Sequence, residues 1–305
     1  MDYLLYITFI FVLIIKYVIA SVKGQDTSIL FLSNTTIFNY NDITELVVFG
    51  DSFSSVDTNY KDMSYTGENR SGGKNWPLQL KDMHNVTLWD FAARGAVVDF
   101  KIVPRDNFKI DMLYEYQKFL DIMTEGKQYG DRWNSTSSLF AIWIGTNDIL
   151  NVNRWKRVNR EFDKVNKVLF NLVEGMYYEG ARNFLFLNIP PMERSPYNKR
   201  GNRNYLKNYI TYFNKVIYNY SENLFKNHPD INLFIYDTNG QYNYILDRCN
   251  QYKYTDCKNA WNKMKGNPNI KKFFWSDFTH MSYRGNAYMA KDIEELLYSI
   301  SRNQN

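Results

Sequence analysis

Metal-binding residues are scarce in this sequence. It contains 2 cysteines and 3 histidines among 305 residues, and none of them stands at the spacing of a zinc site. We therefore expect neither a metal ion nor another cofactor. The same scarcity limits the choice of a general base to three imidazoles, those of His84, His228 and His280.

Long runs of one charge sign are also absent. The formal net charge of +5 comes from 37 basic and 32 acidic residues that are mixed along the chain. No basic block accompanies a nucleic-acid recognition motif. Segment 67–74 is rich in glycine, but Lys74 falls one place late for a phosphate-binding loop and no Ser or Thr follows it. The sequence therefore argues against nucleic acid and nucleotides as ligands.

A long apolar run occupies residues 3–15 and is interrupted by Lys16. It is short for a transmembrane helix but fits the apolar core of a secretory signal peptide, with small residues for cleavage after Ala20 or Gly24. We predict that residues 1–24 form this signal peptide and that the mature protein is extracellular, without stable membrane insertion. An uncleaved signal anchor is the alternative.

Two further features fit export from the cell. Cys249 and Cys257 enclose a short loop, and in an oxidising compartment we expect them to form a disulfide, with two free thiols as the alternative. Five Asn-X-Ser/Thr sequons are candidate glycosylation sites: Asn34, Asn69, Asn85, Asn134 and Asn219. Both features are typical of secreted glycoproteins.

Apolar runs and amphipathic segments alternate along the chain. Runs that are typical of buried strands occupy residues 46–49, 85–91, 138–145, 183–188 and 232–236. Segments that are typical of helices occupy residues 75–82, 108–123, 154–178, 204–226 and 284–301. This alternation predicts an α/β fold, with a parallel sheet of about five strands and helices on both faces. No internal repeat or linker is visible, so we expect one globular domain.

The first of these runs ends in Gly50-Asp51-Ser52, which places a serine just beyond a strand. Ligands bind at the carboxyl edge of a parallel sheet. Gly95 follows the second expected strand and Asn147 the third, so all three residues are expected at one edge. Two simpler interpretations remain open, a plain turn at Ser52 and a helix cap at Asn147. A polar loop over residues 54–74 follows, and its length suggests a functional role.

A serine hydroxyl becomes a nucleophile when an imidazole removes its proton. His84 and His228 precede expected strands and so belong to the opposite edge, which leaves His280. Asp277 stands three residues earlier, and a turn would bring its carboxylate to the far ring nitrogen, where it orients the base. The alternative is an ordinary cap residue beside a surface histidine.

Four short blocks occur in the order and spacing of the SGNH, or GDSL, hydrolase family. They are Gly50-Asp51-Ser52, Gly95, Gly145-Thr146-Asn147-Asp148 and Asp277-x-x-His280. From about Leu46 to its end, the chain resembles this family, and most of all its fungal secreted esterases of the carbohydrate acetylesterase type. Two positions depart from the common pattern, because Met281 replaces a frequent proline and Asp90 a frequent asparagine.

The resemblance implies a flavodoxin-like, three-layer sandwich over residues 45–305, with residues 25–44 as a lead-in. It also implies a catalytic triad of Ser52, His280 and Asp277. An oxyanion hole would consist of Ser52, Gly95 and Asn147. The catalytic domain would then attack esters through an acyl-enzyme.

We expect a monomeric secreted esterase that removes short acyl groups, above all acetyl, from plant cell-wall carbohydrate. Aromatic side chains stack on sugar rings, and the predicted substrate contacts at the sheet edge are Trp76, Trp155, Trp275 and Pro190. Two alternatives remain. One is a lipase or lysophospholipase for longer acyl chains, and the other is a secreted carbohydrate-binding protein that has lost turnover.

Overall fold

The computed structural model describes residues 21–106, 108–152, 156–198, 201, 203–266 and 268–303. Residues 1–20, which hold most of the expected signal peptide, and Trp155 lie outside the described residues. Among the described residues, no helix combines the length and the apolar character that a bilayer crossing needs.

A six-stranded sheet forms the middle layer, in the order β1-β8-β7-β6-β2-β5. Five strands run parallel: β2 (Glu45–Gly50), β5 (Thr87–Asp90), β6 (Ser138–Trp143), β7 (Asn183–Leu187) and β8 (Asn232–Tyr236). The chain goes from β2 to β5 and then returns to β6 on the other side of β2. Strand order therefore reverses at β2, which is where such sheets bind ligands.

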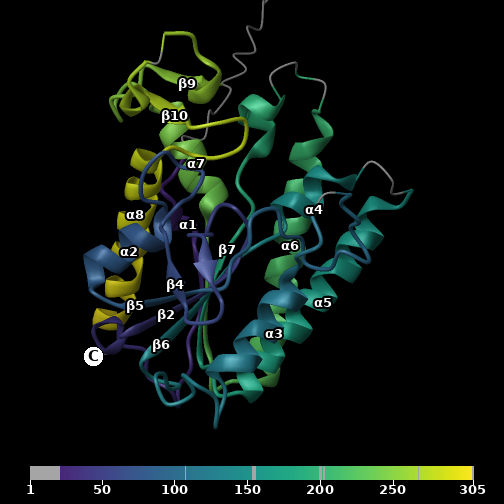
Figure 1. Ribbon diagram of the computed structural model, residues 1–305, viewed down its shortest axis with the longest axis vertical. Coiled ribbons are helices and arrows are strands. Elements are labelled where there is room, and N and C mark those ends of the chain that lie inside the picture. Colours follow the sequence, from purple (N-terminus) through teal and green to yellow (C-terminus); the bar gives the residue numbers. More distant parts are fainter. Residues whose placement is uncertain are drawn as a thin grey trace, which may run out of the picture.

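Helices cover both faces of this sheet, and the structure confirms the predicted α/β sandwich. Figure 1 shows α3, α5 and α6 on one face and α1, α2 and α8 on the other. The helices are α1 (Gly24–Thr27), α2 (Trp76–His84), α3 (Met112–Met123), α4 (Thr146–Leu150), α5 (Val158–Tyr178), α6 (Tyr205–Asn227), α7 (Thr238–Asp247) and α8 (Tyr283–Asn303).

The amphipathic pattern explains how the helices pack. In α5 the buried side chains recur three or four residues apart, which places them on one stripe of the helix: Phe162, Val165, Leu169, Val173 and Met176. The three central strands β6, β7 and β8 are buried at every residue, and β2 and β5 at every residue but the first. This burial on both faces is why the strands appear in the sequence as continuous apolar runs.

The lead-in before the first parallel strand is part of the fold. Its β1 (Ile29–Phe31) adds an antiparallel sixth strand beside β8. The preceding α1 is tied to helices far along the chain, because the Gly24 N–H donates to Gln241 Oε1 at 2.9 Å and the Gln25 N–H to Asp292 Oδ2 at 2.8 Å. The sequence pattern did not reveal β1.

Short elements complete the structure. A small antiparallel pair joins β3 (Thr58–Asn59) to β4 (Ser64–Tyr65), and a parallel pair joins β9 (Asp256–Ala260) to β10 (Phe273–Trp275). The 3₁₀ turns are η1 (Tyr40–Asp42), η3 (Met192–Arg194), η4 (Pro196–Asn198), η5 (Trp261–Lys263) and η6 (Ile270–Lys272).

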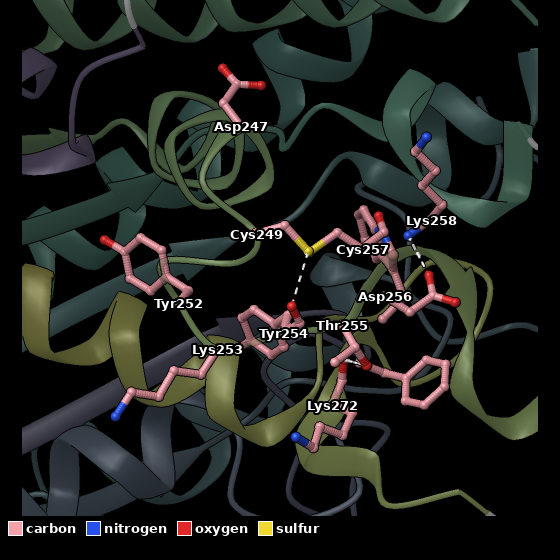
Figure 2. Close-up of a disulfide and its surroundings, with 12 residues drawn as sticks. Asp247, Cys249, Tyr252, Lys253, Tyr254, Thr255, Asp256, Cys257, Lys258 and Lys272 are labelled. Carbon is pink, nitrogen blue, oxygen red and sulfur yellow. Dashed lines mark hydrogen bonds between the residues drawn. A yellow bond between two sulfur atoms is a disulfide. The ribbon is translucent and has the colours of Figure 1, made fainter.

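The predicted disulfide between Cys249 and Cys257 is confirmed, with the two Cα atoms 6.2 Å apart. Figure 2 shows that it joins the chain just after α7 to β9. The indole of Trp275 at the end of β10 donates to the Cys257 carbonyl at 3.0 Å. The disulfide therefore braces the strand pair from which residues 276–280 emerge.

Candidate active site

Ser52 projects from a sharp turn at the carboxyl end of β2. Gly50 permits this turn, because its φ is +150° and an added Cβ would lie 2.3 Å from the Trp143 carbonyl oxygen. After it, the Asp51 carboxylate accepts the Phe53 N–H at 3.0 Å and fixes the loop. The strand thus ends abruptly and leaves the Ser52 side chain partly exposed.

The imidazole of His280 lies against this serine. Its Nε2 is 2.7 Å from Ser52 Oγ, although the two residues are 228 positions apart. Its Nδ1 is 2.8 Å from Asp277 Oδ1 and 2.9 Å from Oδ2. The turn forms because Asp277 Oδ1 also accepts the N–H groups of Thr279 and His280, both at 2.9 Å. The three residues that the sequence singled out therefore meet in one hydrogen-bonded line.

Asp277 is held as a carboxylate. Burial raises its pKa, but the hydrogen bond and charge of His280 and the N–H groups of Thr279 and His280 outweigh burial and lower the pKa well below its usual range. Arg70 adds a further contact that sequence reasoning missed. Its Nε and Nη2 lie 3.1 and 3.0 Å from Asp277 Oδ2, and no motif marks this arginine within the loop over residues 54–74.

The residues expected to donate to the oxyanion line the same cleft as Ser52. Gly95 has φ +80°, and an added Cβ would lie 2.5 Å from the Phe108 ring, so glycine is required there. Neither the Ser52 nor the Gly95 N–H donates to another residue in the described part of the chain. Both lie on the wall of the cleft beside the hydroxyl and the imidazole.

Asn147 is not a helix cap, because Gly145 occupies that position before α4. Its Nδ2 donates to Asp51 Oδ2 at 3.1 Å and to the Ala96 carbonyl at 2.9 Å. Both partners are acceptors, so they fix which end of the amide faces them. The side chain lines the cleft, and its two donor hydrogens are engaged within the protein.

Buried carboxyl groups support the loops beneath the cleft. Burial raises the pKa of Asp51 and of Asp148 to about 7. Burial also raises the pKa of Glu115 well above its usual value, and its two oxygens accept the Gly50 N–H at 2.9 Å and the Ala93 N–H at 3.2 Å. Glu115 therefore joins the ends of β2 and β5, just before Ser52 and Gly95.

Asp90 fills the position where related sequences often have asparagine. Its Oδ1 accepts the Ala92 N–H at 2.8 Å, so the backbone that leads to Gly95 keeps a side-chain acceptor. Met281 fills the other departure, is buried, and pairs with Trp275 in an isolated antiparallel bridge. The local turn that carries His280 is therefore held without a proline.

A cleft of about 440 Å³ opens over Ser52 and His280. That volume is within the range of small-molecule sites. Its walls combine apolar rings, amides and cationic side chains. The lining residues are Ser52, Phe53, Arg70, Arg94, Gly95, Arg105, Phe108, Thr146, Asn147, Leu150, Asn151, Tyr197, Thr279 and His280.

Comparison with known families agrees with this geometry. The model of the family described as GDSL-like Lipase/Acylhydrolase matches residues 46–293 of the chain. The chain belongs to this family. The match begins in β2 and ends in α8, so it includes Ser52, Gly95, Asn147, Asp277 and His280.

Two curated relatives of this GDSL-family chain are acetylesterases. The one from Thermothelomyces thermophilus is 29% identical over 168 residues, which are 50% of this chain and 55% of the relative. The one from Hypocrea jecorina is 28% identical over 178 residues, 49% of each chain. The chain thus matches about half the length of these relatives.

Solved structures of two acetylxylan esterases are also similar to this chain. The acetylxylan esterase Axe2 from Geobacillus stearothermophilus has a TM-score of 0.49 and 11% identity, covering 86% of this chain and 96% of its own. The acetyl xylan esterase AlAXEase has a TM-score of 0.47 and 12% identity, covering 82% and 98%.

The predicted aromatic contacts of this GDSL-family protein need correction. Trp76 and Trp275 are both 0% exposed and do not line the cleft, so they cannot stack on a sugar. The Trp76 indole instead donates inward to Ser54 Oγ at 3.1 Å.

Pro190 is buried as well and is not part of the cleft wall. Trp155 lies outside the described residues. The rings that do line the cleft belong to Phe53, Phe108 and Tyr197.

No group of three or more His, Cys, Asp or Glu side chains within the described ranges is arranged to hold a metal ion. The other two histidines have structural partners. His84 Nε2 lies 2.7 Å from the Tyr40 carbonyl oxygen, and His228 Nε2 lies 2.9 Å from Glu174 Oε1. Neither lines the cleft.

Proposed function

We propose that this protein is a serine esterase in which Ser52, His280 and Asp277 form the catalytic triad. The observation that carries this proposal is the 2.7 Å contact between Ser52 Oγ and His280 Nε2, with Asp277 on the opposite ring nitrogen. A hydroxyl, an imidazole and a carboxylate in this order are the parts that acyl transfer requires.

The reaction proceeds in two halves. His280 Nε2 takes the proton of Ser52 as Oγ attacks the ester carbonyl carbon, and the charge of Asp277 stabilises the imidazolium. His280 then gives this proton to the leaving alcohol as the ester bond breaks, which leaves an acyl-serine. Water adds to the acyl carbonyl in the same way, and the acid leaves as Ser52 recovers its proton.

The Ser52 and Gly95 N–H groups hold the oxyanion that forms in each half. Asn147 Nδ2 is the third donor. It exchanges its hydrogen bond to the neutral Ala96 carbonyl for one to the negatively charged oxygen, while its bond to Asp51 keeps the amide in place. A bond to an anion is stronger than one to a neutral carbonyl, so this donor contributes more in the transition state than in the resting enzyme.

The acyl group removed is short, above all acetyl, and the alcohol is a carbohydrate such as a plant cell-wall fragment. The names of the two curated relatives, both acetylesterases, support the acyl group. One observation favours longer acyl chains as a second candidate. Phe108 lines the cleft and is 41% exposed, and Phe100, Ile110 and Leu113 nearby in the chain are exposed too.

Secretion belongs to the same proposal. Cleavage after Ala20 is favoured over cleavage after Gly24, because Gly24 is buried and bonded to Gln241. Four sequon asparagines are exposed and available for glycans: Asn34, Asn85, Asn134 and Asn219. Asn69 is the least suited, since its Nδ2 donates to the Gly67 and Gly73 carbonyls at 2.8 Å.

A fluorophosphonate probe tests the nucleophile. We expect one covalent adduct on the purified protein, mapped to Ser52 by mass spectrometry and absent from Ser52→Ala. Ser54→Ala is the matched control and keeps the adduct. Absence of labelling in the unaltered protein, together with no hydrolysis of 4-nitrophenyl acetate, would contradict the proposal and favour a binding protein without turnover.

A series of 4-nitrophenyl esters from acetate to decanoate tests the acyl group. We expect kcat/KM to be highest for acetate and to fall with chain length. A maximum at octanoate or longer would replace the acetyl assignment with a lipase-like one.

A further inference from the structure

The charge of the cleft wall is not needed for hydrolysis of a neutral ester. Its lining includes Arg70, Arg94 and Arg105, and no Asp or Glu is among the described lining residues. Guanidinium groups around a partly enclosed site attract anions and raise their local concentration. The triad and the oxyanion donors account for the ester carbonyl, so the arginines are not needed to bind that carbonyl.

Two of these arginines are linked through one loop beside the proposed base. Arg70 belongs to this loop, and Arg94 contacts it. Arg94 Nη2 donates to the Glu68 carbonyl at 2.8 Å. Arg70 lies in the same loop, two residues after Glu68. Arg70 bonds Asp277, and the Ser276 hydroxyl donates to the Arg70 carbonyl at 2.6 Å. The loop over residues 68–70 is therefore fixed against the turn that carries His280. Since His280 delivers the proton to the leaving alcohol, both arginines flank the space that this alcohol occupies.

The third arginine has a different position. Arg105 donates to the Gly95 carbonyl and its guanidinium stacks on the Phe108 ring, 4.3 Å from the centroid. It thus supports the loop of the proposed oxyanion hole. Arg105 therefore positions the backbone, whereas Arg70 and Arg94 lie beside the proposed site of the leaving alcohol.

Arg70 and Arg94 remain accessible to a ligand. The Arg70 side chain is 53% exposed and that of Arg94 is 36% exposed. Arg94 is paired with Glu68 at 3.3 Å, but the Glu68 side chain is 71% exposed, and such surface pairs contribute little. The carboxylate that Arg70 contacts is shared with His280. Both guanidinium groups therefore remain open to solvent at the cleft, although each has an acidic partner in the protein.

We propose that the natural ester carries an anionic group on its alcohol part, and that Arg70 and Arg94 bind this group. The planar guanidinium matches a carboxylate or a phosphate through paired hydrogen bonds. A sugar acid and a sugar phosphate both supply this chemistry. The inference rests on the proposed esterase function and specifies its substrate class.

Three acetylated methyl glycosides that share the glucose ring configuration test the proposal. They are the glucuronate, the neutral glucuronamide and the glucose 6-phosphate. We expect kcat/KM for the better anionic ester to exceed that for the amide by about 10- to 100-fold, the range that one charge-assisted bond supplies. The preference falls in 0.5 M NaCl because salt screens exposed charges. Faster glucuronate hydrolysis identifies a sugar acid, and faster phosphate hydrolysis a sugar phosphate.

Arg94→Gln tests the assignment of the residue. Its matched control is Arg160→Gln, a change of an exposed arginine on α5. We expect the ratio of kcat/KM between the anionic and neutral esters to fall about tenfold in Arg94→Gln, mainly through KM. The control keeps the ratio of the unaltered protein. Equal kcat/KM for the anionic and neutral esters in the unaltered protein would overturn the inference while leaving esterase activity intact.

Binding to Ser52→Ala separates the two proposals. Titration calorimetry with the acetylated glucuronate, the amide and the phosphate needs no turnover. If Ser52→Ala prefers an anionic ester in binding but the unaltered protein hydrolyses none of the three esters, the esterase is contradicted and the anion site is supported. Hydrolysis without any preference in binding or kcat/KM would contradict the anion site alone.

Discussion

Opposite edges of the sheet hold the same chemical pair with different surroundings. At the carboxyl edge, His280 Nδ1 lies 2.8 Å from Asp277, and at the amino edge, His228 Nε2 lies 2.9 Å from Glu174. His280 offers its other nitrogen to Ser52 in the cleft. The His228 ring instead packs on Tyr177, with centroids 4.0 Å apart. An acid–imidazole pair becomes a candidate site only where a strand end also delivers a hydroxyl and N–H donors.

Burial widens this difference. The side chain of Asp277 is 8% exposed, whereas that of Glu174 is 38% exposed. Water screens the second pair, which is therefore worth little. The first pair lies in lower dielectric, where the carboxylate orients and stabilises the imidazole more strongly. Sequence spacing alone does not separate the two cases, because it does not report solvent access.

Replacing each histidine in turn gives the largest expected contrast. His280→Ala removes the base and should lower kcat/KM for 4-nitrophenyl acetate about 10⁴-fold or more. His228→Ala should change it less than about twofold, because His228 lies at the opposite edge of the sheet and does not line the cleft. Circular dichroism checks that both variants fold. Equal losses in the two variants would show that the edges do not differ as proposed.

The oxyanion donor gives a smaller contrast. Asn147→Ala should lower kcat by about 10²- to 10³-fold with little change in KM, since the donor acts on a charge that develops in the transition state. Asn134→Ala, an exposed asparagine before β6, is the matched change at the amino edge and should leave kcat unaltered. A loss confined to KM would instead assign Asn147 to ground-state binding.

The smallest expected contrast between the two edges of the sheet is in how the free energy of unfolding depends on pH. Burial raises the pKa of Asp148 to about 7 in the folded protein, while an unfolded aspartate titrates near 4. The folded state therefore disfavours ionisation, and this group lowers stability as pH rises from about 4 to about 7. Asp148→Asn should remove about 4 kcal/mol of that pH dependence, since each of the roughly three pKa units is worth about 1.4 kcal/mol.

Urea unfolding at several pH values measures this effect. Glu174→Gln, the same change of a carboxyl group to an amide at the opposite edge of the sheet, is the control. An unchanged pH dependence in Asp148→Asn would mean that the carboxyl group is ionised in the folded protein across this range.

The sequence predicted the elements that carry a strong local pattern. The run over residues 138–145 became β6, and the alternation of runs and amphipathic segments fixed the parallel sheet. Placement of the histidines relative to the strands then selected His280. The strand predictions succeed because burial on both faces leaves a continuous apolar signature. The histidines could be assigned to edges because parallel strands share one carboxyl edge.

The remaining features depend on contacts between distant parts of the chain. β1 has only three residues, two of them exposed, so its pairing with β8 leaves no recognisable pattern. Arg70 reaches Asp277 across 207 positions. Trp76 and Trp275 were expected at the cleft from their neighbours in sequence, but packing turns both indoles into the core. Side-chain direction is a property of the packed structure.

Ser52 and His280 are separated by 228 positions, so the proposed activity can arise only late in folding. A nascent chain exposes the serine early and receives its imidazole only after the sheet has been synthesised. Contacts this distant close slowly, because chain entropy must be lost before they form. Regain of ester hydrolysis after dilution from denaturant therefore reports when the C-terminal part, which carries His280, has docked onto the part that carries Ser52.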